Sequence, residues 1–110
     1  MAKKKVPVKD ASAVQAEATS KLLKAVADLD RLKILNYLRA GTKNVSELAE
    51  LLDAEIVNVS HHLGVLRETK LVQDTKKGRF VYYTLHPETY KAGAGGETIH
   101  LGTCRLEIGK

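Results

Sequence analysis

Two helix-forming patterns separated by a very short connection are the feature that most limits what this chain can fold into. The stretch "NVSELAELLD" begins with Asn44 as a candidate N-cap and carries Glu47 three places later, the spacing of a capping box. After Asp53 to Glu55, a second helical pattern continues from Ile56 to about Thr69. Two helices joined by so tight a turn predict a helix-turn-helix.

The second of these helices has two different faces. At 100° per residue its regularly spaced apolar residues fall within an arc of roughly 80°, which predicts the buried side. These residues are Ile56, Val59, Leu63 and Leu66. The opposite side carries Val57, Asn58, His61, Gly64 and Val65, with Ser60 and His62 flanking the buried arc. We therefore expect His61 to be exposed and His62 to lie at the edge.

The outward face suits a helix that enters the major groove of DNA. An Asn58 amide can pair with adenine, and Val57 can touch a thymine methyl group. The side chains of Ser60 and His61 can bond to base edges. An ordinary solvated surface explains the same pattern on this helix alone.

A change to β-branched and aromatic residues follows in "LVQDTKKGRFVYYTL". It predicts strands at about 71–75 and 79–85, with Lys77-Gly78 in the turn. The tip carries the basic residues Lys76, Lys77 and Arg79. A charged hairpin tip usually only faces solvent, but directly after a helix-turn-helix it predicts a wing that binds phosphates. Arg67 is a further candidate contact to the DNA backbone.

The rest of the chain flanks this unit. Residues 1–10 predict a basic, flexible arm. A first helix is expected from Ala11 to about Ala27, and a second begins at Asp28 as its cap and stops near Gly41. The second helix should bury Leu32, Leu35 and Leu38. Residues 11–90 are thus expected to form one mainly α domain with a β-hairpin wing.

Residues 91–110 are expected to be a glycine-rich turn followed by an extended tail. Ile99 and Leu101 alternate in one phase and Leu106 and Ile108 in the other, which implies a bulge or turn near Gly102. A single bulged strand and a hairpin both satisfy this pattern. With the first helix, the tail is expected to build a dimer interface.

The balance of charge favours a polyanionic partner. The chain has 18 Lys and Arg against 13 Asp and Glu, a net charge of +5, which does not separate nucleic acid from an anionic membrane surface. No apolar run is long enough to span a bilayer, and Cys104, the single cysteine, cannot form an internal disulfide. These features predict a cytoplasmic protein.

Four stretches form an ordered series over about residues 20–86: "DLDRLKILNYL", "SELAELL", "VSHHLGVLRETKLV" and "GRFVYYTL". Together they resemble the ArsR/SmtB family of winged-helix transcriptional repressors. The resemblance implies a homodimeric DNA-binding regulator whose affinity for its operator is often controlled by a metal ion or another inducer. The identity of an inducer does not follow from it.

Several residues depart from the family pattern. Asn44 and Ser46 stand where metal-sensing relatives can carry cysteines, and Pro87 with nearby glycines disfavours the C-terminal helix that bears the other common metal site. Glu55 occupies a position that is usually serine. The segment 44–66 holds four acidic residues and no Lys or Arg, so its own charge repels phosphate.

Metal binding and catalysis are weakly supported. His100 and Cys104 could meet their copies across a two-fold axis, although one His and one Cys four apart are more simply a surface imidazole and a buried thiol. No cofactor is expected, and no P-loop, G-x-S-x-G or dinucleotide motif indicates an enzyme. The sequence predicts a homodimer that binds duplex DNA at a palindromic operator and represses transcription. The alternative is a winged-helix module that binds protein and does not read DNA.

Overall fold

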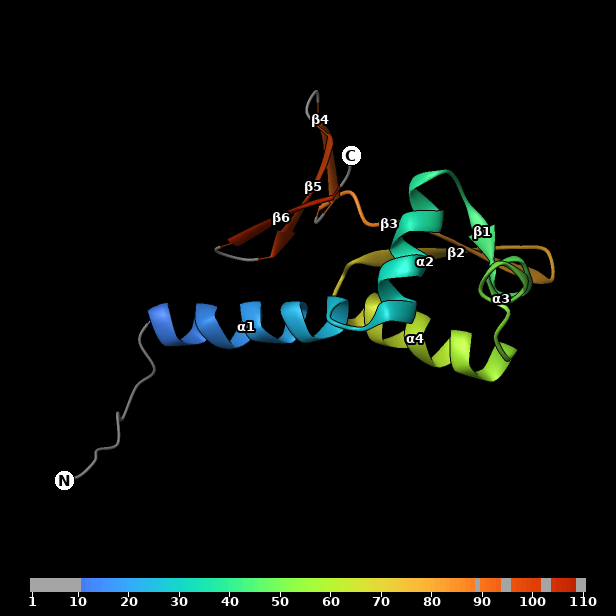
Figure 1. Cartoon of the computed structure of the whole chain (residues 1–110), viewed down its shortest axis with the longest axis horizontal. Helices are drawn as coiled ribbons and strands as arrows, with labels where there is room; N and C mark the ends of the chain where they lie inside the picture. The colour runs from blue at the N-terminus through green and yellow to red at the C-terminus, as the bar shows by residue number, and fades with distance from the viewer. Residues whose placement is uncertain (1–10, 89, 94–95, 102–103, 109–110) are drawn as a thin grey trace.

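The computed structural model describes residues 11–88, 90–93, 96–101 and 104–108, so the basic arm predicted for residues 1–10 lies outside the described residues. Four helices precede two small antiparallel sheets in this part of the chain, and one short strand lies among the helices (Figure 1). The elements are α1 (Ala11–Val26), α2 (Leu29–Arg39), β1 (Lys43–Asn44), α3 (Val45–Leu52), α4 (Ile56–Glu68), β2 (Val72–Lys77), β3 (Phe80–Leu85), β4 (Tyr90–Gly93), β5 (Gly96–Leu101) and β6 (Cys104–Ile108).

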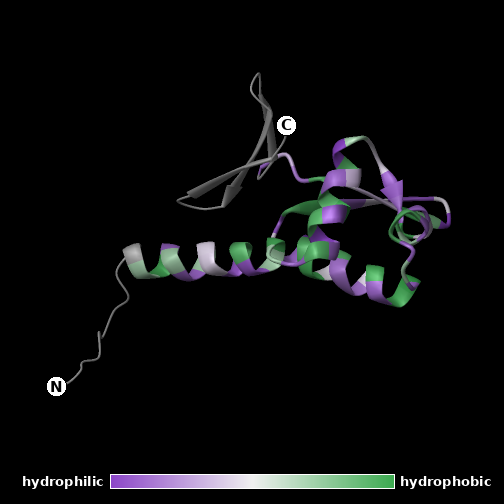
Figure 2. Cartoon of the chain, viewed as in Figure 1, coloured by the Kyte–Doolittle hydropathy of each residue, from purple (hydrophilic) through white to green (hydrophobic). Residues whose placement is uncertain are grey.

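The core lies where α2, α3 and α4 meet the first sheet, and Figure 2 shows the mixture of hydrophobic and hydrophilic positions along these helices. Its largest fully buried side chains are Ile34, Leu35, Leu48, Val59, Leu63, Leu66, Leu71 and Val72. Burial of these aliphatic groups is the main favourable contribution to folding, because each removes its apolar surface from water. The core thereby fixes α4 against α2 and α3, as the helix-turn-helix prediction requires.

Two predicted core residues are exposed. Ile56 keeps 54% of its surface and Leu32 keeps 39%. Ile56 occupies the first position of α4. On α2 the buried stripe runs through Ile34 instead of Leu32, because the half-buried Arg31 shares the inner face.

The predicted helix caps are confirmed. The Asp28 carboxylate accepts a hydrogen bond of 3.1 Å from the backbone N–H of Arg31 at the start of α2. At α3 the capping box is complete, since the Asn44 side chain accepts from the Glu47 backbone and the Glu47 carboxylate accepts from the Asn44 backbone, each at 2.8 Å. Both arrangements satisfy N–H groups that a helix leaves without partners at its beginning.

Strands β2 and β3 form the predicted hairpin, but its turn lies one residue later than expected. Lys77 pairs with Phe80, so the turn residues are Gly78 and Arg79. Gly78 has a φ of +63°, which glycine adopts without a steric penalty. Strand β1 was not predicted; its two residues are too few to show a period, and it joins the sheet through Asn44 opposite Tyr82.

The tail is extended, as predicted, and forms a second sheet of order β4-β5-β6. Ile99 pairs with Leu106 and Leu101 with Cys104, so odd positions on β5 stand opposite even positions on β6. This register accounts for the change of apolar phase near Gly102 and selects the hairpin over the single bulged strand. Strand β4, which pairs with β5, was not predicted.

Helix α1 runs along the long axis of the molecule away from α2, α3 and α4 (Figure 1). Residues 13–18 are all exposed, and burial begins only at Thr19 and continues at Ala25 and Val26. Val14 and Leu23 are exposed apolar residues on this helix. Among the described residues, no helix combines the length and the apolar character needed to cross a membrane.

Candidate nucleic-acid interface

Helix α4 separates its two faces as predicted. Val59, Leu63 and Leu66 are buried, while the four candidate base-reading residues are exposed: Val57, Asn58, Ser60 and His61. Val57 keeps 71% of its surface. Within the described part of the chain, the polar side chains of Asn58, Ser60 and His61 make no hydrogen bond. Their donors and acceptors are therefore directed to solvent and remain unused by the fold.

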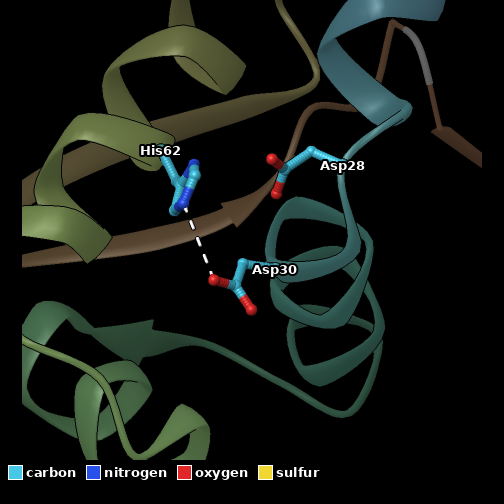
Figure 3. A group of neighbouring side chains, drawn as sticks. All are labelled: Asp28, Asp30 and His62. Carbon is cyan, nitrogen blue, oxygen red and sulfur yellow. Dashed lines mark ion pairs between the residues drawn. The ribbon is translucent and has the colours of Figure 1, made fainter.

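The two adjacent histidines have different surroundings. His61 is exposed, whereas the His62 side chain is only 16% accessible and lies at the edge of the core, as predicted. Nη1 of Arg31 lies 3.2 Å from Nδ1 of His62. Because a guanidinium can only donate, Nδ1 is the acceptor and the proton of the neutral ring is on Nε2. Nε2 faces Asp30, whose nearest carboxylate oxygen is 3.9 Å away (Figure 3).

Arg31 joins three helices at this point. Its Nε donates to the carbonyl oxygen of Ala25 at 2.6 Å, and its Nη2 donates to that of Lys24 at 3.4 Å, both at the end of α1. The contact with His62 adds α4. This junction was not predicted from the sequence, because the contacts of the Arg31 side chain with α1 and α4 form only when these helices pack together.

Asp28, Asp30 and His62 gather residue types that bind metals, with ligand atoms within 4.8 Å of one another (Figure 3). The arrangement does not suit a metal ion. An imidazole that binds a metal through Nε2 carries its proton on Nδ1, and here that proton would meet the N–H donor of Arg31. The Arg31 guanidinium also provides a positive charge near the Asp28 carboxylate. The cluster therefore fastens α2 to α4.

Replacing Asp28 with alanine removes the cap of α2, and we expect it to lower the free energy of unfolding by about 1 kcal/mol at neutral pH. The hydrogen bond from the Arg31 backbone holds the pKa of Asp28 below its ordinary value of 3.8. Because this pKa is lower in the folded state, the stabilisation by the carboxylate is complete above pH 3.8 and is lost as the pH falls through the folded value. Urea denaturation of both proteins over a pH series measures the difference. A difference that stays constant below pH 3.8 would contradict this account.

The basic tip of the wing lies at the same end of the long axis as the beginning of α4 (Figure 1). Lys76, Lys77 and Arg79 are all exposed. Within the described residues none of them has an ion pair or side-chain hydrogen bond. Their charges are available to a polyanion that reaches α4.

Arg67 is placed differently. Its Nη1 lies 3.0 Å from a carboxylate oxygen of Asp74, an ion pair that links the end of α4 to β2. Sequence spacing gave no signal of this pair, because the two residues meet only through the fold. An exposed ion pair of this kind contributes little to stability and is weakened by salt, so Arg67 can exchange Asp74 for a phosphate. Its contact with DNA stays a prediction.

The other two candidate metal ligands, His100 and Cys104, lie in the second sheet. His100 belongs to β5 and Cys104 to β6, where the structure describes the backbone but not the side chains. In the register of the hairpin, His100 pairs with Arg105 and Cys104 pairs with Leu101. A role for either residue in metal binding stays a prediction.

Comparison with known proteins establishes the family of the chain that carries this surface. The family model described as bacterial regulatory protein, arsR family, matches residues 28–74. The transcriptional repressor SdpR of Bacillus subtilis is 35% identical over 65 residues, which cover 59% of this chain and 72% of SdpR. The chain belongs to the ArsR family of bacterial regulatory proteins.

Two further comparisons cover more of the chain. The HTH-type transcriptional regulator NmtR of Mycobacterium tuberculosis is 38% identical over 94 residues, 86% of this chain and 75% of NmtR. The solution structure of a homodimeric winged helix-turn-helix DNA-binding domain from Mycobacterium bovis matches with a TM-score of 0.69 and 26% identity. That match covers 76% of this chain and 78% of the other.

Family membership confirms the resemblance seen in the sequence. This ArsR-family protein is a DNA-binding transcriptional regulator and not an enzyme, and its described domain is a winged helix-turn-helix. The alternative of a module that binds only protein is therefore not favoured. The contacts of individual side chains with DNA stay predictions.

Proposed function

We propose that this protein represses transcription as a homodimer that occupies a roughly palindromic operator in the cytoplasm. One observation carries the proposal: α4 presents polar side chains that the fold does not use, and the basic wing tip lies at the same end of the molecule. Val57, Asn58, Ser60 and His61 read base edges. Lys76, Lys77, Arg79 and, after exchange from Asp74, Arg67 hold the phosphates.

Dimerisation places two copies of α4 on one duplex. The relative from Mycobacterium bovis is a homodimer, and in the present chain α1 exposes the apolar side chains of Val14 and Leu23. Together with residues 91–110, this helix forms the interface in our proposal. Two-fold symmetry then sets the recognition helices about 34 Å apart, one turn of DNA, and makes the operator palindromic.

The contribution of the tail to the dimer is directly testable. A chain that ends at Tyr90 lacks β5, β6 and all but the first residue of β4. We expect it to dissociate to monomers at low micromolar concentration, where the full chain stays dimeric. Sedimentation velocity of both proteins at matched concentrations measures this. A shortened chain that remains dimeric, with unchanged melting, would show that the tail lies outside the interface.

Phosphate contacts from the wing predict a specific dependence on salt. Each alanine at Lys76, Lys77 or Arg79 should weaken binding to operator and random duplex by a similar factor. It should also lower the slope of log affinity against log salt by about one for each phosphate that is no longer neutralised, because fewer counterions are released. Fluorescence anisotropy over a salt series gives both quantities.

Lys33 provides the matched control for the wing, since it is also exposed but lies on α2. Replacement of Lys33 with alanine should leave the salt slope unchanged. Equal salt slopes for the wing variants and the wild type would show that the wing does not contact DNA phosphates. Selecting bound fragments from the source genome supplies the operator, and failure to retain any duplex would overturn the proposed function itself.

A further inference from the structure

Glu55 is an acidic side chain at the start of α4 that makes no side-chain hydrogen bond or ion pair within the described residues. It occupies the N-cap position of α4, with φ of −71° and ψ of 142°, but makes no capping hydrogen bond. It is exposed, and within the described residues its carboxylate has neither a hydrogen-bond partner nor an ion pair. Glu47, by contrast, completes the capping box of α3.

The surroundings of Glu55 are those of a contact surface. Residues 53–56 and Asn58 line a hollow at the beginning of α4. Ile56 and Val57, which follow Glu55 directly, keep 54% and 71% of their surface in water. Glu55 thus lines the same hollow as the exposed apolar Ile56 and as Asn58, one of the predicted base-reading residues.

A carboxylate at the front of a helix in the major groove has few favourable partners. It repels phosphates, and the acceptors on guanine and the O4 of thymine give it no hydrogen bond. Only the amino groups of cytosine and adenine donate in this groove. Adenine places its N7 acceptor beside its amino group, and an acceptor-only side chain cannot satisfy N7 as an amide can.

We propose that Glu55 is a specificity-determining residue that accepts a hydrogen bond from N4 of a cytosine, once in each half-site of the operator. This inference rests on the proposed function, because it requires α4 to enter the major groove. The same carboxylate weakens binding to other sequences, since an unpaired negative charge then lies close to DNA. Glu55 thereby contributes more to discrimination than to affinity.

The test selects binding sites from a randomised duplex library with the full-length wild type and with Glu55→Gln. The wild type should enrich cytosine at one position in each half-site. Glu55→Gln should reduce that preference about tenfold or more and move it towards adenine, which a glutamine amide pairs with through both its donor and its acceptor. Its affinity for random duplex should rise, because a negative charge is removed.

Glu50→Gln is the matched control. Glu50 is an exposed acid on α3, so its replacement removes the same charge from the helix-turn-helix without altering α4. We expect Glu50→Gln to select the same bases as the wild type. If Glu55→Gln also keeps every wild-type preference while Asn58→Ala changes one, the inference about Glu55 fails and the proposed function stands. If the wild type enriches no sequence at all, both fail.

Discussion

Leu63→Ala is expected to lower the free energy of unfolding by about 2 to 5 kcal/mol, the largest loss of stability that we predict. Leu63 has no solvent exposure and belongs to the core shared by α2, α3 and α4. Truncation removes buried methyl groups and leaves a cavity that the packed neighbours fill only in part. Urea denaturation at a fixed protein concentration measures the loss, since a dimer's apparent stability depends on concentration.

Ile56→Ala is the control on the same helix. The helical wheel places Ile56 with Leu63 on the buried arc, but the structure leaves 54% of Ile56 exposed. Its truncation should therefore cost less than about 1 kcal/mol, because little apolar surface returns to water. Equal losses for the two variants would favour the helical wheel over the structure.

The second large effect concerns recognition. Asn58→Ala and His61→Ala should each weaken binding to the operator by about 1 to 3 kcal/mol and change binding to random duplex much less. The reason is that a base contact carries sequence information, whereas a phosphate contact carries only charge. Fluorescence anisotropy with both duplexes gives the ratio of affinities for each variant.

His62→Ala separates the roles of the two neighbouring histidines. His62 contacts Arg31 in the interior, so its loss should lower stability and weaken both duplexes alike, without changing their ratio. A His61→Ala protein whose ratio equals that of the wild type would show that the outward histidine does not read bases. The exposed polar face of α4 would then have to serve another purpose.

Local sequence signals predicted the elements whose boundaries depend on neighbouring residues. The caps at Asp28 and Asn44 are confirmed because each hydrogen bond spans only three residues. Strand β1 escaped prediction because two residues show no period, and its strand identity depends on β3, far along the chain. The turn at Gly78 shifted by one residue because the register of the hairpin decides which residues face each other.

The candidate site divides in the same way. The separation of His61 from His62 followed from helical geometry, since adjacent residues point about 100° apart. The contacts of Arg31 and the ion pair between Arg67 and Asp74 depend on how helices and sheet pack, which no spacing reveals. Glu55 stood out in the sequence only as a departure from the family; its unused carboxylate became apparent with the structure.

The junction at Arg31 gives each subunit a mechanical property. One guanidinium holds both the last carbonyl groups of α1 and the inner edge of α4, so the orientations of these two helices are not independent. In a dimer built on α1, a tilt of one subunit against the other becomes a change in the distance between the two recognition helices. If α1 forms the interface as proposed, a molecule that wedges its two copies apart would change this distance without touching the predicted base-reading side chains.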